Sequence, residues 1–323
     1  MKTNANNAGK CGRSLFDNEN EPDADIKPFY MWAGGKTRLL KHYRPIIDGV
    51  LAANPDVDGY VEPFFGGGAV YCMMHNDYSD IMRSYAINDV NAELMGLLRT
   101  VKSDDVGMFL DECHELASRM LALDGKAERK EWYYNLRGQY WHDYADMDAC
   151  QRSAMLFILM RTGFNGIWQS CKDANGLFAT PAGLLNQSSS KQLFTDANIM
   201  NWHDALQDTA ISCGSYEHAP MPASGGRSLV YLDPPYRHSF TSYGTGFSDD
   251  DQRRLCEWMN AMHADGNIIL MSNRTEDDDR FFHDLLPDAV FHDFDIVYTA
   301  GRRKRTETGF EAKPAHEFLC VLS

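Results

Sequence analysis

The sequence predicts an α/β protein whose parallel sheet is interrupted by a mainly helical insertion. Two short apolar runs, 59–65 and 85–87, are each followed by a helical pattern, which is the alternation typical of βαβ units. Similar buried-type runs return at 211–213, 228–232 and 267–271. The long stretch between these two groups has helical periodicity and is rich in Trp, Tyr and charged residues.

The first part of the chain supplies a tail and then two strands with distinctive ends. Residues 1–26 are rich in Asn, Gly and acidic groups and poor in apolar ones, so we expect a disordered tail. The strand over 59–65 stops at Gly66-Gly67-Gly68, and the strand over 85–87 stops at Asn88-Asp89. Both ends therefore place turn-forming or acidic residues at the sheet edge where α/β proteins bind ligands.

The insertion is expected over 94–190. Helices are predicted over 109–123 and 131–160, where apolar residues recur at helical spacing. Turn signals follow at 162–166 and at Asn175-Gly176, and the second can close a hairpin. We therefore predict a separate, mainly helical domain that carries one hairpin.

The sheet-bearing domain is then discontinuous, with parts at 27–93 and 191–323. Its last two strands are predicted at 295–298 and 317–322, joined by a polar loop. A Ser-rich linker at 187–190 returns the chain from the insertion to the sheet.

Composition constrains the function only loosely. The chain has 323 residues, with 46 acidic against 31 basic side chains and a net charge of −15. This charge alone favours a small-molecule enzyme over a nucleic-acid binder, because neutralising phosphates requires a basic face.

The eight cysteines form no Cys-x-x-Cys pair, so we expect a reducing cytoplasm, with no zinc site and no disulfide framework. The longest apolar run, 154–160, is shorter than the ~20 residues of a membrane helix, and we expect no export signal.

Two glycine clusters are candidate ligand sites. Gly34-Gly35-Lys36-Thr37 is not a triphosphate-binding loop, because Tyr30 stands where that motif needs a glycine. Gly66-Gly67-Gly68 follows a strand, and Asp89 lies 21 residues after its last glycine, at the end of the next strand. An acid at that point suits ribose hydroxyls, so the pair predicts an adenosine-bearing cofactor. Tyr71 replaces the third glycine of a dinucleotide fingerprint, which leaves S-adenosylmethionine and NAD as alternatives.

Asp233-Pro234-Pro235-Tyr236 decides between these cofactors. It directly follows the apolar strand 228–232, at the carboxyl end of the sheet. The prolines fix the backbone and leave rigid carbonyl acceptors beside a carboxylate, an arrangement that suits the two N–H groups of an exocyclic amine. The Tyr236 ring can stack on the base that carries this amine. A proline-rich turn with a capping acid is the structural alternative.

The sequence resembles the Dam-type DNA adenine-N6 methyltransferases. The motifs that carry the resemblance occur in family order at 28–36, 61–70, 87–91, 161–166, 233–236 and 317–319. It implies a Rossmann-like S-adenosylmethionine-dependent methyltransferase sheet with helices on both faces, and a target-recognition domain at 94–190. It also implies site-specific, direct in-line transfer of a methyl group to a flipped-out adenine of double-stranded DNA.

The resemblance also assigns residues to the site. Catalytic roles fall on Asp233, Pro234, Pro235 and Tyr236. Cofactor-binding roles fall on Trp32, Lys36, Phe65, Gly66, Gly67, Gly68, Asp89, Ser215, Tyr216 and Asp233. No metal site is expected, since the His-Glu pairs at 114 and 316 lack the rest of a zinc motif, and we expect a monomer.

DNA contacts are expected from the insertion and from a basic loop. The residues are Arg161, Asn165, Gln169, Lys172, Arg302, Arg303 and Arg305, with Trp168 as a further candidate. Relatives that read GATC carry an Arg where Gln169 stands, and Gln favours adenine, so GATC specificity does not follow from the resemblance. The alternatives are a solvated hairpin with one packed Trp, and a basic loop that only contacts solvent.

Three other functions remain open at this point: a similar enzyme acting on RNA, an inactive nucleic-acid binder, and an NAD oxidoreductase. The oxidoreductase leaves Asp233-Pro234-Pro235-Tyr236 unexplained, and the intact motif residues argue against loss of activity.

The charge of −15 is then expected to be segregated on the surface. The acidic runs 249–251 and 276–279 would lie away from the cleft, and a basic strip would line it.

Overall fold

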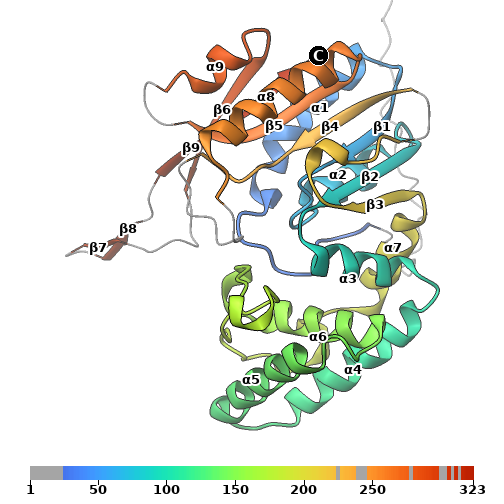
Figure 1. Ribbon diagram of the computed structural model, residues 1–323, viewed down its shortest axis with the longest axis vertical. Helices are drawn as coiled ribbons and strands as arrows, with labels where there is room; N and C mark the ends of the chain where they lie inside the picture. The colour runs from blue at the N-terminus through green and yellow to red at the C-terminus, as the bar shows by residue number, and fades with distance from the viewer. Residues whose placement is uncertain are drawn as a thin grey trace, which may run out of the picture.

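A computed structural model describes residues 25–222, 226–237, 246–275, 279–297, 304–306, 309–311 and 314–323. The chain forms a seven-stranded sheet of order β3-β2-β1-β4-β5-β9-β6 (Figure 1). Strands β1 to β5 pair in parallel, whereas β9 runs antiparallel between β5 and β6. The predicted α/β class is therefore confirmed.

The sheet strands are β1 (Val57–Glu62), β2 (Ser84–Asp89), β3 (Thr209–Cys213), β4 (Arg227–Leu232), β5 (Ile268–Thr275), β6 (Val290–Val297) and β9 (Pro314–Leu322); β7 (Lys304–Thr306) and β8 (Gly309–Glu311) pair separately. The helices are α1 (Leu40–Ala53), α2 (Ala69–Tyr78), α3 (Ala92–Lys102), α4 (Val106–Leu121), α5 (Lys126–Asp143), α6 (Ala149–Thr162), α7 (Asp196–Gln207), α8 (Asp249–Ala264) and α9 (Phe281–Leu285). Short 3-10 turns occur at Lys36–Arg38, Phe164–Gly166, Lys172–Ala174, Ser190–Gln192 and Tyr216–His218.

Both faces of the sheet are buried, as the short apolar runs require. Alternate residues of each strand point to opposite faces. In β4, Leu229 and Tyr231 join one core, while Val230 and Leu232 join another. The first core includes apolar residues of α1, α2, α3 and α7, and the second includes those of α8 and α9. Helices therefore cover both faces, as the sequence predicted.

The order of the strands creates a ligand-binding edge. From β1 the chain passes to β2 and β3 on one side of the sheet, whereas β4 and β5 lie on the other side of β1. β1 and β4 pair in parallel, so their carboxyl ends lie together at the point where the topology reverses. Open α/β sheets bind ligands at such a switch point. The segments that follow β1 and β4 are the two motifs that the sequence singled out.

The helical insertion is the connection between β2 and β3. Helices α4, α5 and α6 gather below the sheet in the view of Figure 1, on the side of α3 and α7. Buried residues of these helices, such as Phe109 and Phe157, belong to the same core as the sheet residue Tyr60. The insertion thus shares its core with the sheet, and its role as a separate recognition domain stays a prediction.

Several element boundaries differ from those predicted. Ile26, which the expected tail included, is buried, and its backbone N–H and C=O both bond the Asn76 side chain at 2.9 Å. The single helix expected over 131–160 is two helices, because Asp148 caps a new helix through the backbone N–H of Gln151. The segment between β6 and β9, expected as a plain loop, contains the β7–β8 pair.

Candidate active site

A cavity of about 810 Å³ lies at the switch point. Its walls come from segments far apart in the sequence: the turns after β1, β2 and β4, residues 32–36, and Ile167 and Trp168 of the insertion. Small-molecule pockets have volumes of roughly 300–1,000 Å³, so this one has room for a cofactor. All the residues that the sequence assigned to catalysis and cofactor binding line this cavity, namely Trp32, Lys36, Phe65, Gly66, Gly67, Gly68, Asp89, Ser215, Tyr216, Asp233, Pro234, Pro235 and Tyr236.

Asp233 is held from two sides. Its Oδ2 accepts a hydrogen bond from Lys36 Nζ at 2.6 Å, and its Oδ1 accepts one from Ser272 Oγ at 3.0 Å. Lys36 and Ser272 are both buried, and the Tyr231 hydroxyl lies 2.9 Å from Ser272 Oγ. An ionised carboxylate has about four acceptor positions, so Asp233 keeps capacity for a further donor. The carboxylate is therefore oriented while its remaining lone pairs are left for a ligand.

Tyr236 is fixed at both its ring and its hydroxyl. The hydroxyl donates to Glu317 Oε2 at 2.7 Å, and Lys36 Nζ lies 4.8 Å from the ring centroid. Glu317 is 2% exposed, and burial raises its pKa, while Lys36 and the Tyr236 hydrogen bond oppose the rise. Lys36 thus supplies positive charge to two buried or half-buried carboxylates, Asp233 and Glu317, at the base of the cavity.

The three glycines of the turn after β1 line the cavity and also have a steric reason within the protein itself. In the structure a Cβ on Gly67 would lie 2.8 Å from Trp32 Cβ, and one on Gly68 would lie 2.6 Å from the Phe65 ring. Gly66 and Gly68 also adopt φ of +48° and +63°, which side chains disfavour. Glycine at these positions therefore leaves space for the Trp32 and Phe65 side chains and allows the sharp turn of the backbone.

Asp89 joins the glycine turn to the end of β2. Its Oδ2 accepts from the Gly66 N–H at 2.9 Å, and its Oδ1 accepts from the Asn91 N–H at 3.0 Å. Burial raises the pKa of Asp89, and these backbone hydrogen bonds oppose the rise. The carboxylate lines the cavity, so it is placed to accept from hydroxyl groups of a ligand.

A pair of aromatic rings forms the far wall. Phe64 and Tyr216 stack at a centroid distance of 5.2 Å, and both line the cavity. Phe64 was not predicted, although it stands directly before the predicted Phe65; alternation along the strand end would have pointed it to the opposite side. Ser215, which was predicted, is exposed at the cavity edge, and its hydroxyl donates to Glu217 at 3.4 Å.

Glu62 is a further cavity residue that was not predicted. It is buried at the end of β1, lines the cavity, and accepts a hydrogen bond from the Tyr60 hydroxyl at 2.7 Å. Burial raises its pKa to about 8. An acid within the apolar run 59–65 was the available signal, because such a residue is rarely buried without a purpose.

The insertion contributes a hairpin-like loop beside the cavity. Asn175 and Gly176 both have positive φ, and the Leu177 N–H bonds the Ala174 carbonyl at 2.9 Å, as in the predicted tight turn. Its two limbs pair as isolated bridges, Ser170 with Phe178 among them, and neither limb forms a strand in the described chain.

Helix α5 supports this loop from below. Tyr133 Oη donates to the Thr180 carbonyl at 2.8 Å, and Trp141 Nε1 donates to the Phe178 carbonyl at the same distance. Arg137, one turn from each, donates to the carbonyls at 179 and 180. Residues four apart share one face of a helix, so one face of α5 holds the whole returning limb.

The predicted DNA contacts of the insertion have unequal exposure. Asn165, Gln169 and Lys172 are exposed. Arg161 is half-buried, donates to the Gln192 carbonyl at 3.2 Å, and has its pKa lowered by burial. Phe164, which was not predicted, is 45% exposed beside Asn165.

Trp168 packs inward rather than outward. It is 6% exposed, and its ring lies 5.8 Å from the Trp32 ring and 5.0 Å from the Phe178 ring. Trp168 is therefore too buried for the DNA contact expected of it, and its ring packs as the alternative predicted. It joins the insertion to the cavity wall instead.

The basic loop 302–305 and the acidic run 249–251 were expected to lie on different parts of the surface. Arg302 and Arg303 lie outside the described residues, and for Arg305 only the backbone, in β7, is described. Asp251, from the acidic run 249–251, lines the same cavity as Asp233. The predicted segregation of acidic runs away from the cleft is therefore wrong for this run.

Metal-binding clusters and membrane helices are both absent from the described residues. Within the part of the chain that the structure describes, no cluster of three or more His, Cys, Asp or Glu side chains is arranged to hold a metal ion. None of the helices in that part is both long and apolar enough to cross a membrane.

A cavity at the switch point of an open α/β sheet, with an oriented carboxylate at its base, is typical of enzymes that bind a small molecule there. Comparison with known proteins places the chain more closely. A family model described as D12 class N6 adenine-specific DNA methyltransferase matches residues 32–304. The chain therefore belongs to this family of adenine-specific DNA methyltransferases, which confirms the resemblance seen in the sequence.

Individual relatives agree with this family. The chain is 33% identical over 255 residues to the type II methyltransferase M.MjaIII of Methanocaldococcus jannaschii, covering 77% of this chain and 84% of that protein. It is 28% identical to the retron Ec67 DNA adenine methylase of Escherichia coli, over 90% of this chain and 89% of that protein. It is 30% identical to the DNA adenine methylase of Salmonella typhi, over 76% and 80% respectively.

Proposed function

We propose that this protein transfers a methyl group from S-adenosylmethionine to the exocyclic N6 amine of a flipped-out adenine, at a specific site in double-stranded DNA. The observation that carries the proposal is the turn 233–236, which leaves β4 and enters the cavity beside the glycine turn. Family membership supplies adenine and DNA as the substrate class. The cofactor, base flipping and site specificity rest on the chemistry of the residues.

The cavity's donor set fits S-adenosylmethionine. The faces of Phe64 and Tyr216 suit an adenine ring, and the Asp89 carboxylate suits ribose hydroxyls. Lys36, which already pairs with a carboxylate, suits the carboxylate of the methionine end. When bound there, the cofactor supplies an electrophilic methyl group on a positively charged sulfur.

Asp233 and Pro234 would act on the amine. The adenine N6 lone pair is delocalised into the ring, which makes the nitrogen a poor nucleophile. Asp233 and the Pro234 carbonyl can each accept one of its N–H groups, which favours a tetrahedral nitrogen with an available lone pair. Among the described residues none donates a hydrogen bond to the Pro234 carbonyl, so this acceptor is available. Positioning and electrostatics then supply the rate enhancement.

Access to the amine requires base flipping. The N6 group cannot be reached inside a stacked duplex. Tyr236 offers a half-buried ring whose hydroxyl is held by Glu317, so the ring is a pre-formed stacking platform. Apolar side chains commonly fill the space that a flipped base leaves, and the exposed Phe164 suits that role.

The DNA-reading surface would be the exposed tip of the insertion. Asn165, Gln169 and Lys172 lie there without deep burial, and α5 fixes the loop behind them. Gln can read adenine through paired donor and acceptor groups, whereas Lys172 suits a phosphate. The particular base sequence is left to experiment.

The test is methyl transfer to unmethylated plasmid DNA, followed by mass spectrometry of the digested nucleosides. We expect N6-methyladenine with the wild-type protein and none with Asp233→Ala. Circular dichroism and calorimetric binding of S-adenosylmethionine check that the variant folds and keeps its pocket. Equal methylation by Asp233→Ala would overturn the mechanism, and a parallel arm with structured RNA tests the alternative polymer. Sequencing of the methylated DNA gives the site.

A further inference from the structure

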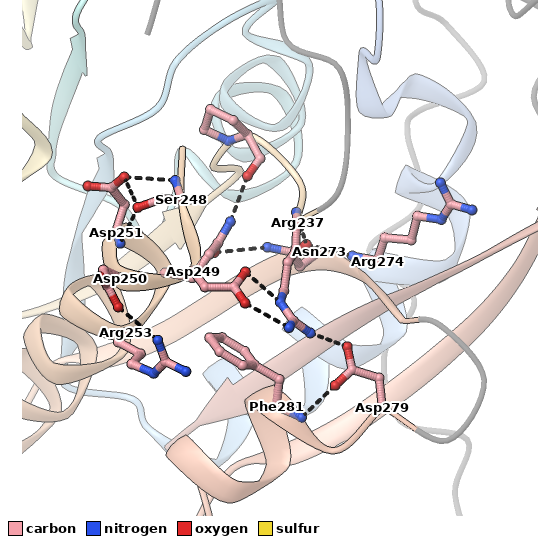
Figure 2. A network of polar contacts seen from close by, with 12 residues as sticks. Arg237, Ser248, Asp249, Asp250, Asp251, Arg253, Asn273, Arg274, Asp279 and Phe281 are labelled. Atoms are coloured by element: carbon pink, nitrogen blue, oxygen red, sulfur yellow. Dashed lines mark hydrogen bonds and ion pairs between the residues drawn. The ribbon is translucent and has the colours of Figure 1, made fainter. Parts of the chain in front are cut away.

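The residue directly after the Asp233–Tyr236 turn is an arginine with a tightly built environment. Arg237 bonds Asp249 through two parallel contacts, Nε to Oδ1 at 2.8 Å and Nη2 to Oδ2 at 2.9 Å. Its Nη1 also donates to Asp279 Oδ2. Figure 2 shows the guanidinium between these two carboxylates. The side chain is only 15% exposed.

The partners of Arg237 come from two different elements. Asp249 is the first residue of α8, and Asp279 lies before α9, where its Oδ1 also accepts the Phe281 N–H at 2.9 Å. The guanidinium carbon lies 4.1 Å from the centroid of the Phe281 ring, which is within cation–π range. Arg237 therefore fastens the end of the 233–236 turn to the amino ends of two helices.

A buried amide pair lies under the same turn. Gln252 Nε2 donates to the Pro235 carbonyl at 2.8 Å, and Asn273 Oδ1 accepts the Arg237 N–H at 3.4 Å. Asn273 Nδ2 in turn donates to Gln252 Oε1 at 3.4 Å. Gln252 and Asn273 are fully buried. The Pro235 carbonyl belongs to the peptide before Tyr236 and the Arg237 N–H to the peptide after it, so both peptide units that flank Tyr236 are held.

We propose that Arg237 is a positioning residue for methyl transfer, which with Gln252 holds the Pro234 carbonyl and the Tyr236 ring in the orientation that receives the target adenine. The inference rests on the proposed function. Prolines fix φ at 234 and 235, so the remaining freedom of the turn is rotation about ψ and about the Tyr236 backbone. The bonds from Gln252, Asn273 and Arg237 restrict rotation about ψ of Pro235 and about the Tyr236 backbone, and so limit where the preceding Pro234 carbonyl can point.

The chain offers a matched control. Arg253 on α8 also lies over Phe281, at 5.2 Å, and pairs with Asp250 at 2.8 Å. It is half exposed and belongs to the same polar network as Arg237, as Figure 2 shows, but neither of these partners belongs to the 233–237 turn. Arg253→Met therefore controls for the loss of a guanidinium beside Phe281. The larger structural cost expected at the more buried Arg237 is separated from a positioning effect by the active fraction and the melting temperature.

The experiment compares Arg237→Met, Arg237→Lys, Gln252→Leu and Arg253→Met in single-turnover methylation of unmethylated plasmid DNA, with enzyme in excess. The amplitude reports the fraction of active enzyme, and the rate constant reports the methylation step. We expect Arg237→Met to lower the rate constant by about 10²-fold, which is the effect of small misplacements in active sites. Arg237→Lys keeps the charge but loses the paired geometry, so its rate constant should lie between those of the wild type and Arg237→Met. Arg253→Met should match the wild type.

The possible outcomes are distinct. A structural role would lower the amplitude and the melting temperature and leave the rate constant unchanged, and this result would overturn the inference. Equal losses at positions 237 and 253 would also overturn it. If Arg237→Met does not fold, Arg237→Lys and Gln252→Leu decide by the same criterion. Failure of the wild type to form N6-methyladenine would instead overturn the proposed function, and the inference with it.

Discussion

Glu93 links the start of α3 to helix α5 and to the loop of the insertion that contains Phe178. It lies in the first turn of α3, four residues after Asp89. Its Oε1 accepts the Tyr140 hydroxyl of α5 at 2.6 Å and the Phe178 N–H of the loop at 3.1 Å. Burial raises the pKa of Glu93 to about 7, although both hydrogen bonds oppose the rise. Replacing it by Gln keeps an oxygen that can accept both bonds and removes the titration.

The sign and size of the effect follow from linkage between protonation and folding. Between pH 4.5, the ordinary value for a Glu side chain, and about pH 7, the folded state binds the Glu93 proton more tightly than the unfolded chain. The free energy of unfolding therefore falls as pH rises through this window, and the loss is complete above it. At about 1.36 kcal/mol for each pKa unit, the loss amounts to about 3 kcal/mol. The Glu93→Gln variant does not titrate at this position, so its free energy of unfolding does not fall for this reason.

The assay is urea unfolding of wild type and Glu93→Gln at pH 5 and pH 8. We compare the free energy of unfolding of the variant with that of the wild type at each pH. From pH 5 to pH 8 this difference should shift in favour of the variant by about 2–3 kcal/mol, whatever its value at pH 5. Glu131→Gln, an exposed position on α5, is the control and should show no such change. A difference between wild type and Glu93→Gln that is the same at both pH values would refute the reasoning.

Three further predictions concern the pocket and the DNA. Gly68→Ala should lose roughly 1–3 kcal/mol in chemical unfolding, since φ is +63° and its Cβ would meet a ring at 2.6 Å, whereas Gly49→Ala, with open space in a helix, should not destabilise. Tyr216→Ala should weaken calorimetric binding of S-adenosylmethionine by roughly tenfold, because an aromatic stacking partner is removed, and unchanged affinity would exclude Tyr216 from the site. Reversing the charge at Arg302 and Arg303 should weaken binding to all DNA sequences and reduce the salt slope by about 0.9 for each phosphate that is no longer neutralised; an unchanged slope would refute the expected contact of this basic loop with DNA phosphates.

The parts of the site that could be predicted from the sequence are those placed by strand ends. Asp89 ends the strand that contains the apolar run 85–87, the 233–236 turn directly follows β4, and parallel strands bring their carboxyl ends to one edge. Residues within a few positions of such an end therefore meet, whatever the rest of the chain does. The position of the cavity could thus be predicted without any knowledge of how its walls pack.

The contacts that orient these groups could not be predicted in the same way. Lys36 and Asp233 are 197 positions apart, and Tyr236 and Glu317 are 81 apart. Both pairings depend on how helices and strands settle around the sheet, which no local pattern specifies. Packing also explains Trp168, since an aromatic residue in a polar loop suggests a surface contact until the Trp32 ring is seen beside it.

Net charge was misleading for a related reason, because a single total does not say where the charges lie or which of them are paired. Asp249 and Asp279 neutralise Arg237, while Asp250 and Asp251 pair with Arg253 and Arg254. The run also occupies the first turn of α8, where carboxylates are stabilised by the helix dipole. The charge of the run is therefore balanced by neighbouring arginines at the edge of the cavity. Through Arg237, the run also holds the end of the 233–236 turn. Its presence beside the cleft is compatible with a DNA substrate.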